Sequence, residues 1–332
     1  MILPVFIPHQ GCPYRCVFCN QVDITGSQEK ADEKMFRDTL RTYFGNKSLS
    51  ELPKNREVAF YGGSFTGLPA RRQEHLLGLV QPWVEQGWVN AIRLSTHPLY
   101  IDPDRLALLK KYRVKTVELG IQSTDPNVLD HSGRPCTWET MESAVAAIRS
   151  NGFRLGLQLM PGLPGDTDRT FLKSVEDTLK LNPDFVRLYP TLVIRNTKLF
   201  EMYREGKYTP WSLERTVENL KTAVKRYRKN DIPVIRMGLH PDPSMLENYV
   251  DGPYHPSLRY LVDCRIGLDE MIERIRGRKK LTGAVKFRVP LNTTSIYVGH
   301  KRENIRKLKE MFGLEKITLH AENDCDRLQL IA

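Results

Sequence analysis

Three cysteines near the start of the chain carry the clearest chemistry. Cys12, Cys16 and Cys19 form a C-x3-C-x2-C array directly after the short apolar run of residues 2–7. Three thiolates on one tight loop can hold three irons of a [4Fe–4S] cube. The fourth iron is then open to a small molecule, because closed electron-transfer clusters normally use four thiolates. A zinc site also requires a fourth ligand, which His9 could supply, so zinc is the alternative.

The array, with the aromatic Phe18 before its last cysteine, resembles the one in radical S-adenosylmethionine (SAM) enzymes. In that family the open iron binds the amino and carboxylate groups of SAM. An electron from the cluster cleaves the sulfonium to methionine and a 5′-deoxyadenosyl radical, which abstracts hydrogen. The resemblance implies that Cys12, Cys16 and Cys19 ligate a [4Fe–4S] cluster. It also implies SAM as a cofactor and an electron donor such as flavodoxin or ferredoxin.

Paired glycines follow the second expected strand. Gly62 and Gly63 let the backbone approach a ligand closely, and the family has a Gly-Gly motif here that binds the amino group of the methionine part. A plain tight turn is the other interpretation. At the third strand end, Ser95 could contact the cofactor, and His97 precedes a proline and so has extended backbone. His97 fits a cofactor contact and a structural role equally.

A further set of polar residues resembles two subfamilies, the oxygen-independent coproporphyrinogen oxidases and the catalytic subunit of Elongator. In them a strand-four glutamine, a following arginine and a polar residue on strand five meet the ribose and carboxylate of SAM. The resemblance assigns these positions to Gln122, Arg134 and Gln158. Arginine offers a fork to a carboxylate, and carboxamides suit ribose hydroxyls. Porphyrinogen oxidases tend to an aspartate at the position of Gln158, so the Elongator-like branch is favoured.

Apolar, β-rich runs alternate with helical periodicity over about the first 240 residues. Strands are expected at residues 3–7, 57–61, 91–95, 115–119, 154–160, 184–188 and 233–237. Helices are expected at residues 32–44, 70–85, 104–112, 138–151, 169–181 and 213–229. This alternation favours an α/β fold, a partial (β/α)6 barrel whose chemistry lies at the carboxyl ends of parallel strands. Arg187, Tyr189 and Arg236 are expected to face a substrate cavity there, whereas Glu118 is expected to point outward.

The C-terminal part differs in composition. We expect the barrel domain to span residues 1–245 and a small basic α+β domain to span residues 246–332. The expected elements of the second domain are a helix at 256–276, strands at 284–289 and 295–298, a helix at 303–312, and strands at 316–320 and 327–331. From residue 270 to residue 310 there are twelve Lys and Arg residues against four acids. This excess indicates a polyanionic partner such as RNA, with a solvated basic face as the alternative.

The stretch of residues 296–308 resembles a KH module, in which a Gly-x-x-Gly loop before an amphipathic helix clamps the RNA backbone. In this chain Arg302 replaces the second glycine of the loop. The resemblance implies that the nucleic-acid-binding residues are Gly299, Lys301, Arg302 and Arg306.

Composition and charge limit the class of protein. The chain has 332 residues, of which 40% are hydrophobic and 27% charged, as in ordinary globular proteins. Its formal net charge of +11 is compatible with an RNA partner. No apolar run approaches the roughly 20 residues that cross a bilayer, and the N-terminus has no basic segment typical of a signal peptide. An oxygen-sensitive cluster points to the reducing cytoplasm.

These observations predict a radical SAM enzyme of the Elongator-like branch that modifies an RNA, either tRNA or rRNA. The first alternative is a radical SAM enzyme acting on a small metabolite or tetrapyrrole, with the basic domain binding substrate carboxylates. The second alternative is a non-catalytic zinc protein that binds RNA. The sequence identifies neither the atom attacked nor a catalytic hydrogen donor.

Overall fold

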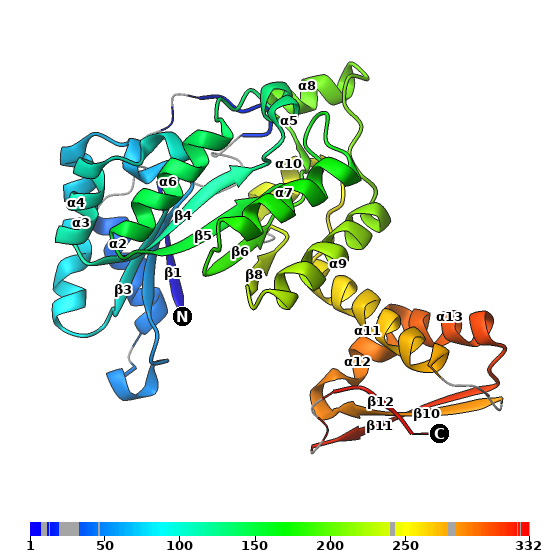
Figure 1. Cartoon of the computed structure of the whole chain (residues 1–332). Helices are drawn as coiled ribbons and strands as arrows, with labels where there is room; N and C mark the ends of the chain where they lie inside the picture. The colour runs from blue at the N-terminus through cyan, green and yellow to red at the C-terminus, as the bar shows by residue number, and fades with distance from the viewer. Residues whose placement is uncertain are drawn as a thin grey trace. The chain divides into compact units, whose positions relative to one another are not determined.

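The computed structural model describes residues 1–7, 12, 14–19, 33–45, 47–239, 243–277, 283–323, 325 and 327–331 (Figure 1). The chain divides into two compact units. The barrel unit comprises Met1–Ser212 and Tyr227–Tyr254, and the basic unit comprises Leu213–Arg226 and His255–Ala332. None of the described helices is both long and apolar enough to cross a membrane.

The barrel unit is built on a sheet of seven parallel strands in the order β1-β2-β3-β4-β5-β6-β8. The strands are β1 (Ile2–Phe6), β2 (Glu57–Tyr61), β3 (Ala91–Thr96), β4 (Val114–Gln122), β5 (Arg154–Leu159), β6 (Phe185–Leu188) and β8 (Val234–Met237). A short antiparallel pair, β7 (Val193–Ile194) with β9 (Tyr249–Asp251), lies outside this sheet. The prediction of a partial barrel is confirmed, because every expected strand forms within a few residues of its expected ends.

Helices connect the strands, and Figure 1 shows α3, α4 and α6 along one side of the sheet. The helices of this part of the chain are α2 (Glu33–Phe44), α3 (Ala70–Glu85), α4 (Pro103–Lys111), α5 (Pro126–His131), α6 (Trp138–Ser150), α7 (Asp168–Lys180), α8 (Lys198–Arg204), α9 (Leu213–Lys229) and α10 (Pro243–Asn248). Three short 3-10 helices are η1 (Leu49–Glu51), η2 (Phe65–Gly67) and η3 (Pro98–Tyr100). Side-chain caps fix several helix starts, as where Asp102, Thr137 and Thr167 accept backbone N–H bonds.

Alternate residues of the strands have opposite roles. Leu94, Val117 and Leu155 lie side by side on neighbouring strands and are 0% exposed, in the core between sheet and helices. Complete burial of one such side chain contributes about 1.5–3 kcal/mol. Residues of the other parity, such as Arg93 and Glu118, lie on the concave face of the sheet. The sheet therefore presents polar groups on the face where a barrel holds its ligands.

Besides residues 213–226 of α9, the described part of the basic unit contains three α-helices, two short 3-10 helices and a three-stranded sheet. Its elements are α11 (Leu258–Arg276), β10 (Ala284–Pro290), η4 (Leu291–Thr293), α12 (Thr294–Val298), η5 (His300–Arg302), α13 (Glu303–Phe312), β11 (Lys316–Glu322) and β12 (Gln329–Leu330). The sheet order is β11-β10-β12, with β10 parallel to β11 and antiparallel to β12. Met271, Phe287, Val289 and Leu308 are 0% exposed in its core.

One expected element of this unit is wrong. Residues 295–298 were expected as a strand, but they belong to the helix α12. Tyr297 is buried in the core of the unit, and both Ile296 and Tyr297 pack against Gly267 of α11. A Cβ at Gly267 would lie 3.0 Å from Ile296 Cγ2, so the two helices approach closely at this point. Packing against α11 therefore outweighs the β propensity of the short segment.

Candidate active site

The cysteine loop is held by backbone hydrogen bonds to two distant parts of the barrel unit. The Val17 N–H donates to the Ser132 carbonyl at 3.0 Å, and the Leu199 N–H donates to the Val17 carbonyl at 2.8 Å. The Val17 side chain is buried with Val193, Leu199 and Tyr208. The end of α5 and the start of α8 thus fix the position of the loop that follows β1.

The thiols of the array differ in their surroundings. Burial raises the pKa of the Cys16 thiol, the positive charge of Arg134 lowers it by less, and the neighbouring Cys12 raises it further. Cys12 Sγ donates a weak hydrogen bond to the Tyr14 carbonyl at 3.7 Å. The Cys19 N–H donates to the Cys16 carbonyl at 2.9 Å, which makes a tight turn. Cys12 and Cys16 are therefore within electrostatic reach of each other.

The three thiols are held on one loop but are not gathered into a metal site. Among the described residues, no three His, Cys, Asp or Glu side chains are arranged to hold a metal ion. None of the six cysteines forms a disulfide. His9, the fourth ligand of the zinc alternative, lies outside the described residues. Ligation of one cluster by Cys12, Cys16 and Cys19 requires their side chains to turn toward one another.

Arg134 follows α5, lies beside the cysteine loop and is 7% exposed. Its Nη1 donates to Cys16 Sγ at 3.7 Å, and its Nη2 donates to the Gly120 carbonyl of β4. Its Nε has no hydrogen-bond partner within the described part of the chain. A buried donor without a partner costs about 1–3 kcal/mol. An anionic ligand that accepts from this Nε–H would therefore be strongly stabilised.

The two predicted glutamines meet across neighbouring strands. Gln158 Nε2 of β5 donates to Gln122 Oε1 of β4 at 3.2 Å. The register of β4 and β5 shifts between Gly120 and Gln122, and Gln122 has a φ of 70°. A Cβ at Gly120 would lie 2.8 Å from Gln122 Nε2 and 3.3 Å from Arg134 Nη2. The structure thus brings Gln122, Gln158 and Arg134 together, and the missing side chain of Gly120 makes room for them.

The remaining predicted SAM residues lie at the ends of β2 and β3. Gly62 has a φ of 84° directly after β2, a conformation that favours glycine. Gly63 follows it and is partly exposed. Ser95 Oγ donates to the Phe60 carbonyl of β2 at 3.5 Å. Within the described residues, no hydrogen bond joins these three residues to Gln122 or Arg134, so they form a separate group on neighbouring parallel strands.

His97 is a buried, neutral histidine beside the cysteine loop. Its Nδ1 accepts the Leu99 N–H at 3.2 Å, and its Nε2 has no hydrogen-bond partner in the described part of the protein. Burial, together with the smaller effect of the Arg134 charge, lowers the pKa of His97 to about 3. The centre of its ring lies 5.6 Å from that of Tyr14. The sequence left the role of His97 open, and its surroundings now connect it with the site.

A buried ion-pair network occupies the concave face of the sheet, and sequence reasoning missed it. Glu118 accepts from Tyr61 Oη at 2.9 Å and from Arg93 Nη1 at 3.0 Å, and its second oxygen pairs with Arg187 Nε at 2.6 Å. Arg93 also pairs with Glu57. The expectation that Glu118 points outward is wrong, because two buried arginines supply the countercharge that its burial requires. The sequence did carry a signal for this network. Four strands have a charged residue at an inward-facing position, and both acids and arginines occur among them.

The residues expected at a substrate cavity lie at the carboxyl ends of β6 and β8. Arg187 is 9% exposed and paired with Glu118, and its Nη1 donates to Tyr189 Oη at 3.1 Å. Tyr189 and Arg236 are both partly exposed, and Arg236 Nε donates to the Gly238 carbonyl at 3.2 Å. The guanidinium group of Arg187 therefore belongs to the buried ion-pair network.

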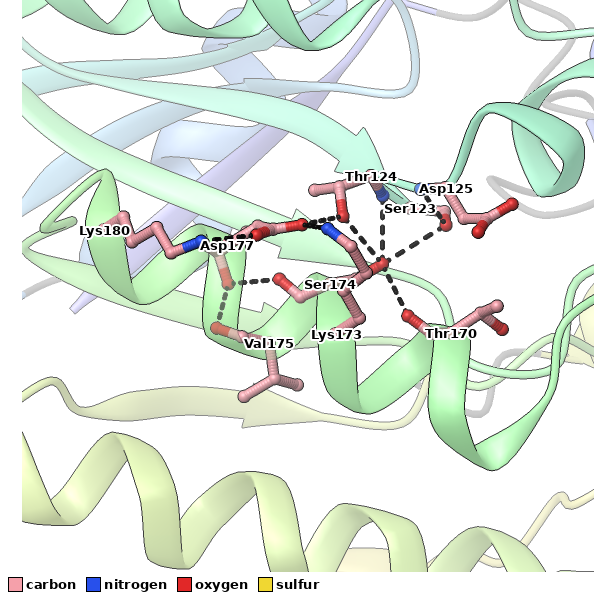
Figure 2. A network of polar contacts seen from close by, with 10 residues as sticks. Ser123, Thr124, Asp125, Thr170, Lys173, Ser174, Val175, Asp177 and Lys180 are labelled. Atoms are coloured by element: carbon pink, nitrogen blue, oxygen red, sulfur yellow. Dashed lines mark hydrogen bonds and ion pairs between the residues drawn. The ribbon is translucent and has the colours of Figure 1, made fainter.

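A second polar network follows β4 and ties it to α7 (Figure 2). The Thr124 N–H donates to Ser174 Oγ at 3.0 Å, and Thr124 Oγ1 donates to Asp177 at 2.8 Å. Lys173 and Lys180 donate to the two oxygens of Asp177 at 2.6 and 3.0 Å. Figure 2 shows these groups linking the strand end to one helix face. The network holds the strand end that carries Gln122.

Three of the four predicted nucleic-acid residues, Lys301, Arg302 and Arg306, line one hollow of the basic unit. The hollow has a volume of about 700 Å³, and its polar lining is five cations and one acid: Lys301, Arg302, Arg306, Lys309, Lys316 and Glu310. Lys301 and Arg302 have φ angles of 49° and 62°, so the loop keeps a left-handed backbone at the position where Arg302 replaces glycine. Gly299 has a φ of 78°, and a Cβ there would lie 2.6 Å from Asn304 Cγ. Glycine is therefore required at the first position of the loop.

Two family models match the chain. The model described as the radical SAM superfamily matches residues 6–178, and the model described as the radical SAM C-terminal domain matches residues 183–267. The first match covers more than half of the chain. It includes all the residues predicted to bind the cluster or SAM.

Curated relatives share only part of their length with this chain. The tRNA uridine(34) acetyltransferase of Methanocaldococcus jannaschii is 31% identical over 136 residues, which are 40% of this chain and 25% of that protein. The human Elongator complex protein 3 is 29% identical over 192 residues, which are 52% of this chain and 35% of that protein. The chain thus spans about a quarter to a third of the length of these relatives.

The fold matches that of a solved archaeal protein. The Methanocaldococcus infernus Elp3 with an N-terminal deletion has a TM-score of 0.63 and 20% identity, over 83% of this chain and 63% of that chain. A sequence identity this low supports likeness of fold alone. The coverage extends beyond the residues of the superfamily match.

Proposed function

Because the chain belongs to the radical SAM superfamily of enzymes, we propose that it uses radical SAM chemistry to modify an RNA. The observation that carries the proposal is the cation-lined hollow of the basic unit, beside a loop with left-handed backbone. The non-catalytic zinc protein considered from the sequence is wrong, since the chain belongs to an enzyme superfamily.

The cofactors of the superfamily are a [4Fe–4S] cluster and SAM. The donor set fits them: once their side chains turn toward one another, Cys12, Cys16 and Cys19 supply three thiolates and leave one iron open. The buried, unpartnered Nε–H of Arg134 lies beside this loop, within the described residues, as a donor for an anion. Together the two cofactors supply one-electron chemistry that removes a hydrogen atom from the substrate.

The side chains around the loop would orient SAM. Arg134 would hold its carboxylate through a charge-assisted hydrogen bond. Gln122 and Gln158, which already contact each other at 3.2 Å, would bind ribose hydroxyls. The amino group of SAM would donate hydrogen bonds to the backbone at Gly62 and Gly63 and to the hydroxyl of Ser95. A reducing cytoplasm, with flavodoxin or ferredoxin as the electron donor, completes this proposal.

Charge and geometry favour a nucleic acid as the ligand of the basic unit. Five cations around one hollow attract a polyanion, and exposed Lys301 and Arg302 lie in the loop that resembles the RNA clamp of KH modules. Arg306 lies one turn further along α13 and is exposed on the same hollow. Curated relatives of the chain are named tRNA uridine(34) acetyltransferase, which is a name of tRNA modification. These observations support RNA over a small anion, which needs fewer cations.

Binding is tested with tRNA and rRNA fragments at several salt concentrations. Phosphate contacts release counterions, so the affinity should fall steeply as salt rises. A triple variant with Lys301, Arg302 and Arg306 changed to Gln should lower the slope of log affinity against log salt by roughly 2. A Lys110→Gln, Lys115→Gln variant, which changes exposed lysines of the barrel unit, is the control. Salt-independent binding, or an equal effect of the control, would contradict the proposal.

Catalysis is tested with the anaerobically reconstituted protein. RNA from a strain that lacks the gene should stimulate the formation of 5′-deoxyadenosine, and mass spectrometry of that RNA should show a modified nucleoside. The alternative substrate is a small metabolite or tetrapyrrole. Stimulation by a small-molecule extract with no response to RNA would replace the proposal with this alternative.

A further inference from the structure

The hydrogen-bonding state of His97 is set by its neighbours. The Leu99 N–H donates to Nδ1 at 3.2 Å, so Nδ1 must be the acceptor nitrogen of the ring. A neutral imidazole with an acceptor at Nδ1 carries its proton on Nε2. Burial and the nearby charge of Arg134 both keep the ring neutral. His97 therefore presents an N–H donor at Nε2.

This donor is buried without an acceptor. The His97 residue is 2% exposed, and its Nε2 has no hydrogen-bond partner among the residues that the structure describes. Leaving such a donor unsatisfied costs about 1–3 kcal/mol. Phenylalanine or leucine would fill the same space without this cost. Among the described residues the donor is thus left for an acceptor such as a bound ligand.

The surroundings of His97 indicate which acceptor this is. Its ring centre lies 5.6 Å from that of Tyr14 in the cysteine loop and 6.0 Å from that of Tyr100. Tyr100 is in turn within electrostatic reach of Cys12 and Tyr14. Arg134, whose charge reaches His97, donates to Cys16 Sγ at 3.7 Å. The groups around His97 therefore belong to the loop whose sulfurs would hold the cluster.

We propose that His97 donates its Nε2–H to a sulfur atom of the cluster held by Cys12, Cys16 and Cys19, and that this hydrogen bond raises the reduction potential of the cluster. Hydrogen bonds to cluster sulfurs stabilise the more negatively charged, reduced state. His97 thereby makes the cluster easier to reduce by its electron donor. The proposal depends on the cluster and not on the identity of the substrate, so it stands apart from the assignment of RNA.

Two substitutions of His97 test the Nε2–H donor without disturbing the local fold. In His97→Asn, the side-chain oxygen can still accept the Leu99 N–H and so preserve the start of η3, but the amide does not reach the position of Nε2. In His97→Gln, the longer side chain places an amide N–H near that position. His75→Asn on α3, where the histidine is exposed, is the matched control.

The main measurement is a potentiometric titration of the cluster, followed by electron paramagnetic resonance, on the full chain. At a fixed applied potential, His97→Asn should lower the ratio of reduced to oxidised cluster about tenfold, which is 59 mV for one electron. His97→Gln should lie closer to the wild type, and His75→Asn should not differ from it. The affinity for SAM, measured by calorimetry, should stay within about twofold in all three variants.

Two results would overturn the proposal. An unchanged potential with weaker SAM binding would show that His97 contacts SAM and not the cluster. An unchanged potential with unchanged SAM binding would show that the donor has no ligand. If the wild type assembled no cluster at all, the family assignment of the cofactor would fail, and this outcome is distinct from both.

Discussion

Buried arginines occur in two different environments in the barrel unit. Arg93 and Arg187 face Glu118 at 3.0 and 2.6 Å, so their charge is balanced within the protein. Arg134 is equally buried, but among the described residues its neighbours are a sulfur and a carbonyl, with no carboxylate. A buried charge that has its countercharge is compatible with a stable fold, whereas one that lacks it is costly unless a ligand supplies the countercharge. The comparison therefore separates Arg93 and Arg187, which are paired within the protein, from Arg134, which we propose binds a ligand.

The largest expected effect comes from removing the shared countercharge. Glu118→Ala leaves Arg187 buried without a carboxylate, while Arg93 retains Glu57. Breaking a buried pair in this way should lower the free energy of unfolding by about 3–5 kcal/mol. Urea denaturation followed by circular dichroism measures it. Glu142→Ala, at an exposed position of α6, is the control and should change the value by less than about 0.5 kcal/mol.

Substitution of Arg134 should weaken SAM binding and leave the free energy of unfolding almost unchanged. Arg134→Met keeps the apolar length of the side chain but removes every donor. The SAM dissociation constant should rise roughly 10- to 100-fold, because a hydrogen bond to a charged group is worth about 1.5–3 kcal/mol. The free energy of unfolding should change by less than about 1 kcal/mol, since an unsatisfied buried donor is also removed. A large loss of stability with unchanged SAM affinity would place Arg134 among the structural arginines.

Local patterns in the sequence were sufficient for most of the fold. The strands and helices of the barrel unit follow from alternation of apolar runs and helical periodicity, because these patterns determine which faces become buried. The exception at residues 295–298 shows the limit of this reasoning. Ile296, Tyr297 and Val298 have β propensity but lie in a helix, because Gly267 on α11 offers a close packing surface. Such a contact between distant segments leaves no signal within the segment.

The site was predictable to a lesser degree. Motifs identified Arg134, Gln122 and Gln158, and the structure does bring these residues together. The inward position of Glu118 was missed, because its burial depends on partners in three other strands. The left-handed backbone of Gln122 and the register shift beside it were also not predictable, since no glycine marks the position.

A substitution of Gly120 tests the proposed role of Arg134 with a smaller expected effect. In Gly120→Ala the new Cβ would lie 2.8 Å from Gln122 Nε2 and 3.3 Å from Arg134 Nη2, so both side-chain ends must move. Because these ends are flexible, the free energy of unfolding should fall by only about 1 kcal/mol. The SAM dissociation constant should rise about tenfold, as expected for the loss of one good hydrogen bond. A variant that binds SAM normally would show that the two side chains do not contact it.

The smallest effect concerns the network in Figure 2, where Asp177 has its countercharges in the protein. Burial raises the pKa of Asp177, but hydrogen bonds from Lys173, Lys180 and Thr124 outweigh this and leave it below its ordinary value. Because the folded pKa is the lower one, the resulting stability is fully present above about pH 4 and is lost as pH falls through the folded pKa. Asp177→Asn should therefore reduce the free energy of unfolding by about 1 kcal/mol at pH 6, and the difference from the wild type should shrink below pH 4.

Urea denaturation at a series of pH values measures this, with Asp104→Asn on an exposed position of α4 as the charge-matched control. A difference that stays constant down to pH 3 would show that the lysines do not act on Asp177 as a charged group, and the network would then hold β4 to α7 through neutral hydrogen bonds alone.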